Sequence, residues 1–267
     1  MKNYTKKDYT VINSKTWDAW SKNGCEWTIP ITHEEFVDAR DHDRWGVYLT
    51  PCRYVPREWF GGELRRKKLL GLASGGGQQM PLFAARGAEC TVFDYSDAQL
   101  EKERLTAARE GYQIQILKGD MTKPLPFFDC SFDIVFHPVS NCYIHEVEPV
   151  WRECFRVLKP GGRLIAGFDN GLNFLFDEDG TLPLIAKNKL PYNPLAMSDE
   201  EFEAQRDNLN AIQFSHSLEE QLGGQLRAGF ILRDLYEDRD REGCGHLREY
   251  TPQYMATLAI KPINERM

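Results

Sequence analysis

Three consecutive glycines, Gly75, Gly76 and Gly77, stand between a short apolar segment (residues 69–73) and an amphipathic one (residues 80–86). The apolar segment is predicted to form a buried strand, and the amphipathic one a helix. Glycine has no Cβ, so a turn of this kind lets backbone N–H groups approach a small ligand closely at the start of a helix. The sequence therefore predicts a ligand site at the glycine turn.

Polar groups also stand at the ends of the next three predicted strands: Asp94, Asp120 with Met121, and His137. The carboxyl ends of parallel strands meet at one edge of a sheet, so we expect these groups near the glycine turn. A carboxylate such as Asp94 can accept hydrogen bonds from both hydroxyls of a ribose. Asp120 can accept from the exocyclic amine of a purine, with Met121 packed on the ring face. The alternative for both aspartates is a helix cap or a turn.

Two classes of cofactor fit a glycine turn followed by an acid. A nicotinamide or flavin dinucleotide needs the fingerprint G-x-G-x-x-G, whose third glycine would fall at position 80, where this sequence has Met80. The G-x-x-x-x-G-K pattern of a phosphate-binding loop is also absent from this turn. The sequence therefore favours a nucleoside ligand without a phosphate chain.

This set of motifs resembles the class I S-adenosylmethionine-dependent methyltransferases, in the broad group that includes the ubiquinone and menaquinone methyltransferases. The matching segments are residues 72–77, 92–96, 119–121, 132–136 and 156–162, the last being an R-V-L-K-P-G-G run before a predicted strand. The resemblance implies an enzyme that uses S-adenosylmethionine as its cofactor. It also implies methyl transfer by in-line displacement to a small-molecule acceptor.

The resemblance further implies a role for each matching position. Gly75 and Gly77 would let the backbone approach the amino-acid end of the cofactor. Asp94 would bind the ribose hydroxyls, and Asp120 with Met121 would hold the adenine. The full set of expected cofactor-binding residues is Ser74, Gly75, Gly76, Gly77, Gln79, Asp94, Tyr95, Asp120, Met121 and His137.

Three residues at or after the end of the fourth predicted strand are candidates for catalytic roles: His137, Asn141 and His145. A histidine can act as a general base for a hydroxyl acceptor, whereas a neutral amine or an activated carbon needs little beyond alignment. Asn141 can orient the acceptor or the cofactor. Each histidine has the alternative of a structural or solvent-exposed position.

Two positions depart from the family pattern. Gly71 stands where the family has an acid, and Ala73 stands where it has the first glycine of the loop. We interpret this as a variant loop. In this interpretation Gln78, Gln79 or a residue of the N-terminal segment replaces the missing contact to the ammonium group of the cofactor.

Strand and helix patterns alternate from residue 69 onward and position these groups. The expected strands are residues 69–73, 90–94, 113–118, 131–136, 163–168, 231–236 and 254–260. The expected helices are residues 9–21, 33–40, 80–86, 97–110, 147–158 and 217–228, with a turn at residues 159–162. Such alternation predicts an α/β fold with a doubly wound, mostly parallel seven-stranded sheet, the Rossmann-like fold of these methyltransferases.

The sequence also predicts how the chain is divided. Residues 1–62 contain five of the six tryptophans and are expected to form an N-terminal helical cap. Residues 63–267 are expected to form the S-adenosylmethionine-binding domain. A segment at about residues 169–215 breaks the strand and helix rhythm, and we interpret it as a lid-like insertion.

Composition bounds the class of protein. The chain has 267 residues and a net charge of −7, and this acidic balance argues against nucleic acid as a partner. Seven cysteines without a C-x-x-C pair indicate reduced thiols and no metal site. The first ten residues lack the apolar core of a signal peptide, and no stretch has the length of a membrane span. We therefore expect a cytoplasmic protein that does not bind membranes, while its oligomeric state stays open.

Two other functions stay open at this point. The altered positions Gly71 and Ala73 are the only support for a non-catalytic protein that binds S-adenosylmethionine or S-adenosylhomocysteine. A dinucleotide-dependent oxidoreductase on a similar sheet is the other alternative, and Met80 counts against it.

Overall fold

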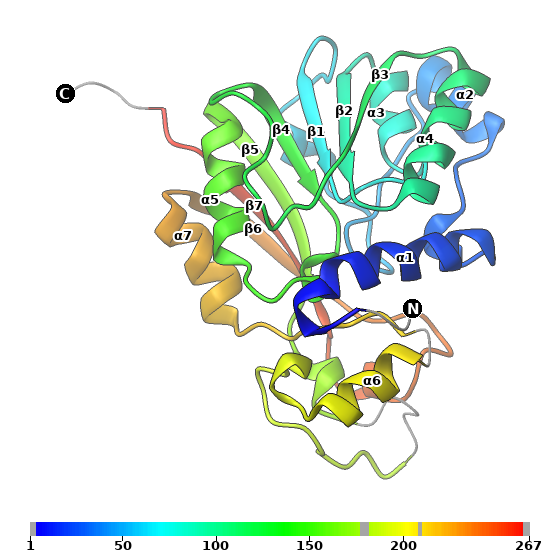
Figure 1. Cartoon of the computed structure of the whole chain (residues 1–267). Coiled ribbons are helices and arrows are strands. Elements are labelled where there is room, and N and C mark those ends of the chain that lie inside the picture. Colours follow the sequence, from blue (N-terminus) through cyan, green and yellow to red (C-terminus); the bar gives the residue numbers. More distant parts are fainter. Residues whose placement is uncertain (1–3, 177–181, 208–209, 264–267) are drawn as a thin grey trace.

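Seven strands form one sheet in the order β3-β2-β1-β4-β5-β7-β6 in the computed structural model (Figure 1), which describes residues 4–176, 182–207 and 210–263. The strands are β1 (Lys68–Leu72), β2 (Glu89–Asp94), β3 (Ile114–Lys118), β4 (Phe132–His137), β5 (Leu158–Asp169), β6 (Ile231–Asp238) and β7 (Tyr254–Ile260). Strands β1 to β5 are parallel, and β7 runs antiparallel to both β5 and β6. The prediction of a mostly parallel seven-stranded sheet is confirmed.

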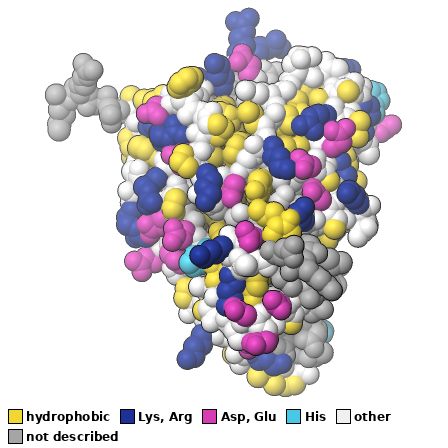
Figure 2. Space-filling model, viewed as in Figure 1, with side chains coloured by type: hydrophobic (Ala, Val, Ile, Leu, Met, Phe, Trp, Pro, Cys, Tyr) yellow, Lys and Arg dark blue, Asp and Glu magenta, His cyan; other side chains and the backbone are white. Residues whose placement is uncertain are grey.

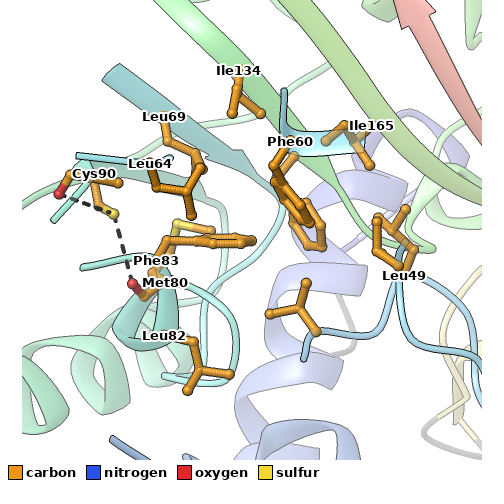
Figure 3. Close-up of a cluster of buried hydrophobic side chains, with 14 of the residues drawn as sticks. Leu49, Phe60, Leu64, Leu69, Met80, Leu82, Phe83, Cys90, Ile134 and Ile165 are labelled. Atoms are coloured by element: carbon orange, nitrogen blue, oxygen red, sulfur yellow. Dashed lines mark hydrogen bonds between the residues drawn. The ribbon is translucent and has the colours of Figure 1, made fainter. Parts of the chain in front are cut away.

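Helices cover both faces of the sheet, because successive residues of each strand point to opposite faces and both sets are apolar. On one face Leu69 packs with side chains of α2 and α3, and on the other Leu70 packs with side chains of α5. The helices are α1 (Tyr9–Lys22), α2 (His33–His42), α3 (Met80–Ala85), α4 (Asp97–Glu110), α5 (Glu148–Val157), α6 (Asp199–Asp207), α7 (Gly224–Ala228) and α8 (Leu247–Tyr250). Figure 3 shows the first of these cores, where Phe60 and Phe83 meet the side chains of the strands.

The N-terminal segment is tied both to the sheet and to α4. Asp18 of α1 accepts hydrogen bonds from the Ser96 hydroxyl and the Ala98 N–H, at 2.7 and 2.9 Å, at the start of α4. Farther along the chain, Trp59 and Phe60 are buried in the same core cluster as the side chains of β1. The N-terminal helices are present as expected, but residues near 60 belong to the core of the sheet. The boundary at residue 62 stays a prediction.

The described part of the insertion packs against α1. Its helix α6 begins at a capping box, in which the Ser198 N–H donates to Glu201 Oε2 and the Glu201 N–H donates to Ser198 Oγ, at 2.9 and 3.2 Å. Phe202 and Phe214 form a small apolar cluster with Ile12 of α1. The insertion is therefore held to the N-terminal helix by its own core, in the lobe at the bottom of Figure 1.

One local prediction is wrong, and one predicted helix has an irregular first turn. Residues 159–162 are not a free turn but the first part of β5, because the Gly161 N–H and the Gly162 carbonyl both pair with Lys261. The predicted helix at residues 217–228 contains a π-helical turn before α7.

The π-helical turn has a physical reason in a neighbouring tryptophan. The N–H of Gly224 donates to the carbonyl of Glu219, one residue earlier than an α-helix would use. This leaves the Glu220 carbonyl to accept the indole N–H of Trp151 at 3.2 Å. Gly224 also needs its missing side chain here, because a Cβ would lie 2.7 Å from the Trp151 ring.

Two features of the molecule concern its expected partners. In the part of the chain that the structure describes, no helix is long and apolar enough to cross a membrane. Figure 2 shows basic and acidic side chains interspersed on one face of the molecule, with no broad basic stripe there.

Candidate functional site

A cavity of about 1260 Å³ opens at the carboxyl ends of strands β1 to β5. Seven of the ten expected cofactor-binding residues lie on its wall, namely Ser74, Gly75, Gln79, Asp94, Tyr95, Asp120 and Met121. The other three, Gly76, Gly77 and His137, are not part of the wall. Pockets for one drug-sized ligand have volumes of roughly 300–1,000 Å³, so this cavity has room for two ligands side by side.

The three N–H groups of the glycine loop (residues 75–77) all have partners within the protein. In chain order they donate to Asp94 Oδ2 at 2.9 Å, to the Gln99 carbonyl at 3.0 Å and to Glu103 Oε2 at 2.8 Å. These N–H groups are therefore not free donors for a ligand, which differs from the sequence prediction. The first glycine is required for a different reason, since a Cβ on it would lie 2.9 Å from Gln99 and 3.0 Å from Asp94.

Glu103 holds the end of the glycine loop from inside the protein. It lies on α4 and is fully buried, and its second oxygen accepts the hydroxyl of Tyr112 at 3.1 Å. Burial raises the pKa of Glu103 to about 7, although the hydrogen bonds from Gly77 and Tyr112 lower it. The sequence did not single out Glu103. A buried glutamate in an amphipathic helix has the same sequence pattern as a solvent-exposed one.

The surroundings of Gly71 account for one departure from the family pattern, whereas Ala73 is held in a strained conformation. A Cβ on Gly71 would lie 2.6 Å from the sulfur of Met80, so the Met80 side chain fills the space that a larger residue would need. Ala73 has a φ of 50°, in the left-handed region that favours glycine. Gln78 donates to the carbonyls of Glu26 and Ile29, at 3.2 and 3.1 Å, and so ties the loop to the N-terminal segment.

Asp94 is placed as an acceptor for a ligand with hydroxyl groups. Its two oxygens accept the N–H groups of Gly75 and Ser96, both at 2.9 Å, and each oxygen keeps a further lone pair. Burial raises the pKa of Asp94, with these backbone hydrogen bonds acting in the opposite direction. Within the described residues it forms no ion pair with a lysine or arginine. Such a carboxylate fits a ribose diol.

Asp120 and Met121 stand together at the end of β3. Asp120 Oδ1 accepts the Thr122 N–H at 2.9 Å, and both side chains reach the cavity wall. Gly119 precedes them because a Cβ there would lie 2.2 Å from the Phe93 ring. An acceptor beside a thioether fits an adenine amine and ring, as expected from sequence.

The wall also bears on the choice between cofactor classes. Arg241 is the single lysine or arginine among its described residues, and it forms an ion pair with Glu26. A phosphate chain needs cations or free N–H donors, and the three N–H groups of the glycine loop already donate within the protein. The residues present therefore fit a nucleoside without phosphates.

The predicted catalytic residues lie away from the cavity wall. His137 is fully buried, with Nδ1 2.9 Å from the Leu72 carbonyl and Nε2 2.8 Å from Asn141 Oδ1. Asn141 in turn donates to Gln221 Oε1 at 3.0 Å. Burial lowers the pKa of His137, which favours the neutral ring. This geometry gives His137 and Asn141 a structural role, linking β1 and β4 to the π-helical turn.

His145 also offers no contact with the cavity. Its side chain is exposed, its Nε2 lies 3.2 Å from Asn193 Nδ2, and its ring packs against Phe214 at a centroid distance of 5.4 Å. The structure therefore brings seven of the ten cofactor candidates to one cavity, whereas His137 and Asn141 meet beneath it and His145 lies apart from them.

Aromatic side chains of the N-terminal segment form one side of the cavity wall. Trp17, Trp20 and Trp27 all lie on the wall, and the rings of Trp17 and Trp20 meet edge to face at 5.2 Å. Arg241 lies over the Trp27 ring at 4.1 Å, which joins this segment to the chain after β6. These tryptophans shield the cavity, unlike Trp59, which is core.

The far end of the cavity is built by residues outside the expected cofactor-binding set and the three catalytic candidates. They come from the end of β5, the insertion, the segment after β6 and the start of β7: Asp169, Asn173, Phe174, Tyr192, Asp240 and Tyr254. Asp169 follows the last residue of a predicted strand, as Asp94 ends another. The rule that polar groups at strand ends mark the site, applied to the fifth strand, would have found it.

Comparison with known proteins gives consistent matches. The family model described as "Methyltransferase domain" matches residues 70–166. The chain is 41% identical to the uncharacterized methyltransferase YbaJ of Bacillus subtilis, over 93% of this chain and 97% of that protein. It is 35% identical to a demethylmenaquinone methyltransferase of Clavibacter sepedonicus, but only over 37% of this chain and 40% of that protein.

Solved structures match in fold. An S-adenosylmethionine-dependent methyltransferase from Mesorhizobium loti superposes with a TM-score of 0.60, covering 74% of this chain and 93% of that chain. The sequence identity is 16%, so this likeness shows the shared fold.

We expect Ala73→Gly to stabilise the protein. Relief of the left-handed strain on a residue with a Cβ is worth roughly 1 kcal/mol, which outweighs the added freedom of the unfolded chain. Urea unfolding measures the change. Ala108→Gly in the exposed face of α4 is the matched control and should destabilise by about 1 kcal/mol. Equal destabilisation by both variants would contradict the strained conformation of Ala73.

We expect Glu103→Gln to change how stability depends on pH. The pKa of Glu103 is about 7 in the folded protein and 4.5 in its ordinary state, so its favourable contribution is complete below pH 4.5 and is lost as the pH rises through 7. Glutamine does not titrate, so the variant has no such pH-dependent contribution to its stability. Between pH 5 and pH 8, the unfolding free energy of the wild type should therefore fall relative to the variant by about 2–3 kcal/mol. Parallel profiles for the two proteins in urea unfolding would show that Glu103 does not titrate in this way.

Proposed function

Since this chain belongs to the class I S-adenosylmethionine-dependent methyltransferases, we propose that it methylates a small-molecule acceptor by in-line displacement. The observation that carries the proposal is the single cavity of about 1260 Å³, whose wall runs from Gly75 and Asp94 to Asp169 and Tyr254. The part of the cavity at Asp94 and Asp120 has the hydrogen-bond acceptors that a nucleoside needs. The part at Asp169 is space that the nucleoside leaves for a second ligand.

In this proposal each half of the cavity has its own task. Asp94 accepts the ribose hydroxyls, and Asp120 with Met121 holds the adenine. Bound S-adenosylmethionine supplies an electrophilic methyl group on a positively charged sulfur. Ser74, whose hydroxyl lies 3.1 Å from Gln79 Oε1, borders the amino-acid end of the cofactor. Alignment of the acceptor with the methyl–sulfur bond supplies most of the rate.

The enclosure of the cavity supports a small acceptor. The tryptophans of the N-terminal segment and the described part of the insertion both contribute to its wall. The Glu26–Arg241 ion pair and the stacking of Arg241 on Trp27 join the N-terminal segment to the chain after β6. We infer that the segment at about residues 169–215 serves as a lid that excludes water from the reaction.

This proposal is favoured over the two alternatives. An oxidoreductase would need a place for a pyrophosphate, whereas Arg241, the one lysine or arginine on the described wall, is paired with Glu26, and the N–H groups of residues 75–77 donate within the protein. A protein that only senses the cofactor would have no use for a second compartment beside it. We also infer a cytoplasmic location, because seven cysteines without paired spacing are typical of proteins in a reducing compartment.

Calorimetry with S-adenosylhomocysteine tests the site directly. We expect micromolar binding by the wild type, in the range of typical cofactor affinities. Asp94→Asn should weaken it at least tenfold, because the ribose loses a charged acceptor. Asp97→Asn is the matched control, since Asp97 is exposed and pairs only with Lys118; its affinity should stay within twofold. Absence of heat with the wild type would contradict the proposed function, and an unchanged affinity in Asp94→Asn would contradict the ribose assignment.

The same titrations should depend on pH. Burial raises the pKa of Asp94, so its charge is lost at a higher pH than that of an ordinary aspartate. The affinity of the wild type should therefore fall as the pH is lowered toward 5, while that of Asp94→Asn should stay flat. Wild-type and variant profiles with the same slope would show that Asp94 does not carry the effect.

A further inference from the structure

We propose that the acceptor is an amine bound in its ammonium form, and that Asp169 takes its proton before methyl transfer. This inference rests on the proposed function, because it concerns the half of the cavity that the cofactor does not fill. It assigns a catalytic residue in place of His137 and His145, which do not reach the cavity.

The position of Asp169 follows from the order of the strands. Asp94 and Asp120 follow β2 and β3, on one side of β1, whereas Asp169 is the last residue of β5, on the other side beyond β4. A nucleoside that contacts Asp94 and Asp120 spans the ends of β1 to β3. The ends of β4 and β5 are then left to the acceptor, and Asp169 is the carboxylate that the sheet places there.

The burial and bonding of Asp169 are those of a proton acceptor. Its side chain borders the cavity although the residue is only 7% exposed. Oδ1 accepts the Gly171 N–H at 2.5 Å and Oδ2 accepts the Asn173 amide at 2.6 Å, so each oxygen keeps a lone pair. Among the described residues no lysine, arginine or histidine forms an ion pair with it. A buried carboxylate without a counter-charge is costly, and a cationic ligand removes that cost.

The surroundings tune Asp169 for proton transfer near neutral pH. Burial raises its pKa to about 7, and the nearby Asp240 acts in the same direction. The other titratable groups that face it are Tyr254 on β7 and Cys142 before α5, and burial raises the pKa of each, so both stay neutral. A base whose pKa lies near the working pH is the most efficient one.

Two aromatic rings on the same cavity wall as Asp169 fit the remainder of an amine. Phe174 and Tyr192 both lie on the wall and stack at a centroid distance of 5.7 Å. Ring faces attract ammonium groups and also cover an apolar body. His246 is the one histidine of the described residues on this wall, but it is exposed and lies 3.3 Å from Glu249. The geometry thus favours Asp169 as the base.

The proposed step transfers one proton and one methyl group. One proton passes from the ammonium group of the acceptor to a carboxylate oxygen of Asp169, which leaves a lone pair on nitrogen. That pair forms the nitrogen–carbon bond to the methyl group as the methyl–sulfur bond breaks, and the electrons of the broken bond stay on sulfur. The product is a methylated ammonium, and Asp169 then releases its proton to solvent.

Two probe compounds of equal shape test the inference: 2-phenylethylamine and 2-phenylethanol. Calorimetry with the full chain saturated with S-adenosylhomocysteine should show the amine binding at least tenfold more tightly than the alcohol. Asp169→Asn should weaken the affinity for the amine at least tenfold. It should change the affinities for the alcohol and for S-adenosylhomocysteine less than twofold. Asn keeps the acceptor for Gly171, and the Asn173 amide can turn to present its oxygen, so the fold is retained. Asp97→Asn should behave like the wild type.

Methyl transfer from S-adenosylmethionine to 2-phenylethylamine, followed by mass spectrometry, gives the second readout. We expect kcat/KM of the wild type to rise through about pH 7 and that of Asp169→Asn to be at least 100-fold lower and flat, as expected for loss of a general base. Asp240→Asn removes only the neighbouring charge, so it should move the inflection of the wild-type profile to lower pH. This shift tests Asp169 even where Asp169→Asn folds poorly.

These measurements distinguish failure of the inference from failure of the proposed function. Equal affinity for amine and alcohol, equal transfer by Asp169→Asn, or an inflection that Asp240→Asn leaves in place would overturn the inference while leaving the proposed function intact. Failure of the wild type to bind S-adenosylhomocysteine would instead overturn the proposed function.

Discussion

The three N–H groups of the glycine loop need acceptors in a buried place, and the way this need is met organises the rest of the site. One acceptor comes from Asp94 at the end of β2, and two come from α4, the Gln99 carbonyl and the Glu103 carboxyl. Leaving a buried N–H without a partner costs roughly 1–3 kcal/mol, so the loop cannot move without breaking its ties to both elements. The loop, β2 and α4 therefore act as one rigid wall. A nucleoside bound against it meets a surface that is already formed.

The same constraint explains why the N-terminal segment belongs to the site. The Gly77 carbonyl accepts the Ile31 N–H at 2.9 Å, and Asp18 of α1 holds the first turn of α4. The segment that carries the cavity tryptophans is thus fastened to the glycine loop itself and to α4, one of the two elements that fix the loop. Since the described part of the insertion packs on α1, it is held, through that helix, to the glycine loop and α4.

The sequence predicted the sheet and the near half of the cavity well because both rest on local signals. Apolar runs, glycines and strand-end acids are visible in a few residues, and the sheet brings Asp94 and Asp120 to one edge. The catalytic candidates were less well predicted, because a histidine after a strand gives no sign of which way its ring points. His137 is turned inward by Leu72 and Asn141, and Asn141 by Gln221, which lies 80 residues farther along the chain. Glu103 likewise depends on burial, which only the assembled fold creates, whereas Asp169 carried the same strand-end signal as Asp94.

The two buried carboxylates on the cavity wall illustrate how one sheet edge separates two tasks. Asp94 and Asp169 both end a strand and both accept two N–H groups, and burial raises the pKa of each. They differ in what faces them. Asp94 accepts only backbone N–H groups and stands beside the rigid glycine loop, which suits a fixed hydrogen-bond acceptor for an uncharged diol. Asp169 accepts one side-chain amide, that of Asn173, besides the Gly171 N–H, and burial together with Asp240 raises its pKa to about 7, which suits exchange of a proton near neutral pH. Because β1 and β4 lie between them, the two carboxylates can be tuned separately while they serve a single cavity.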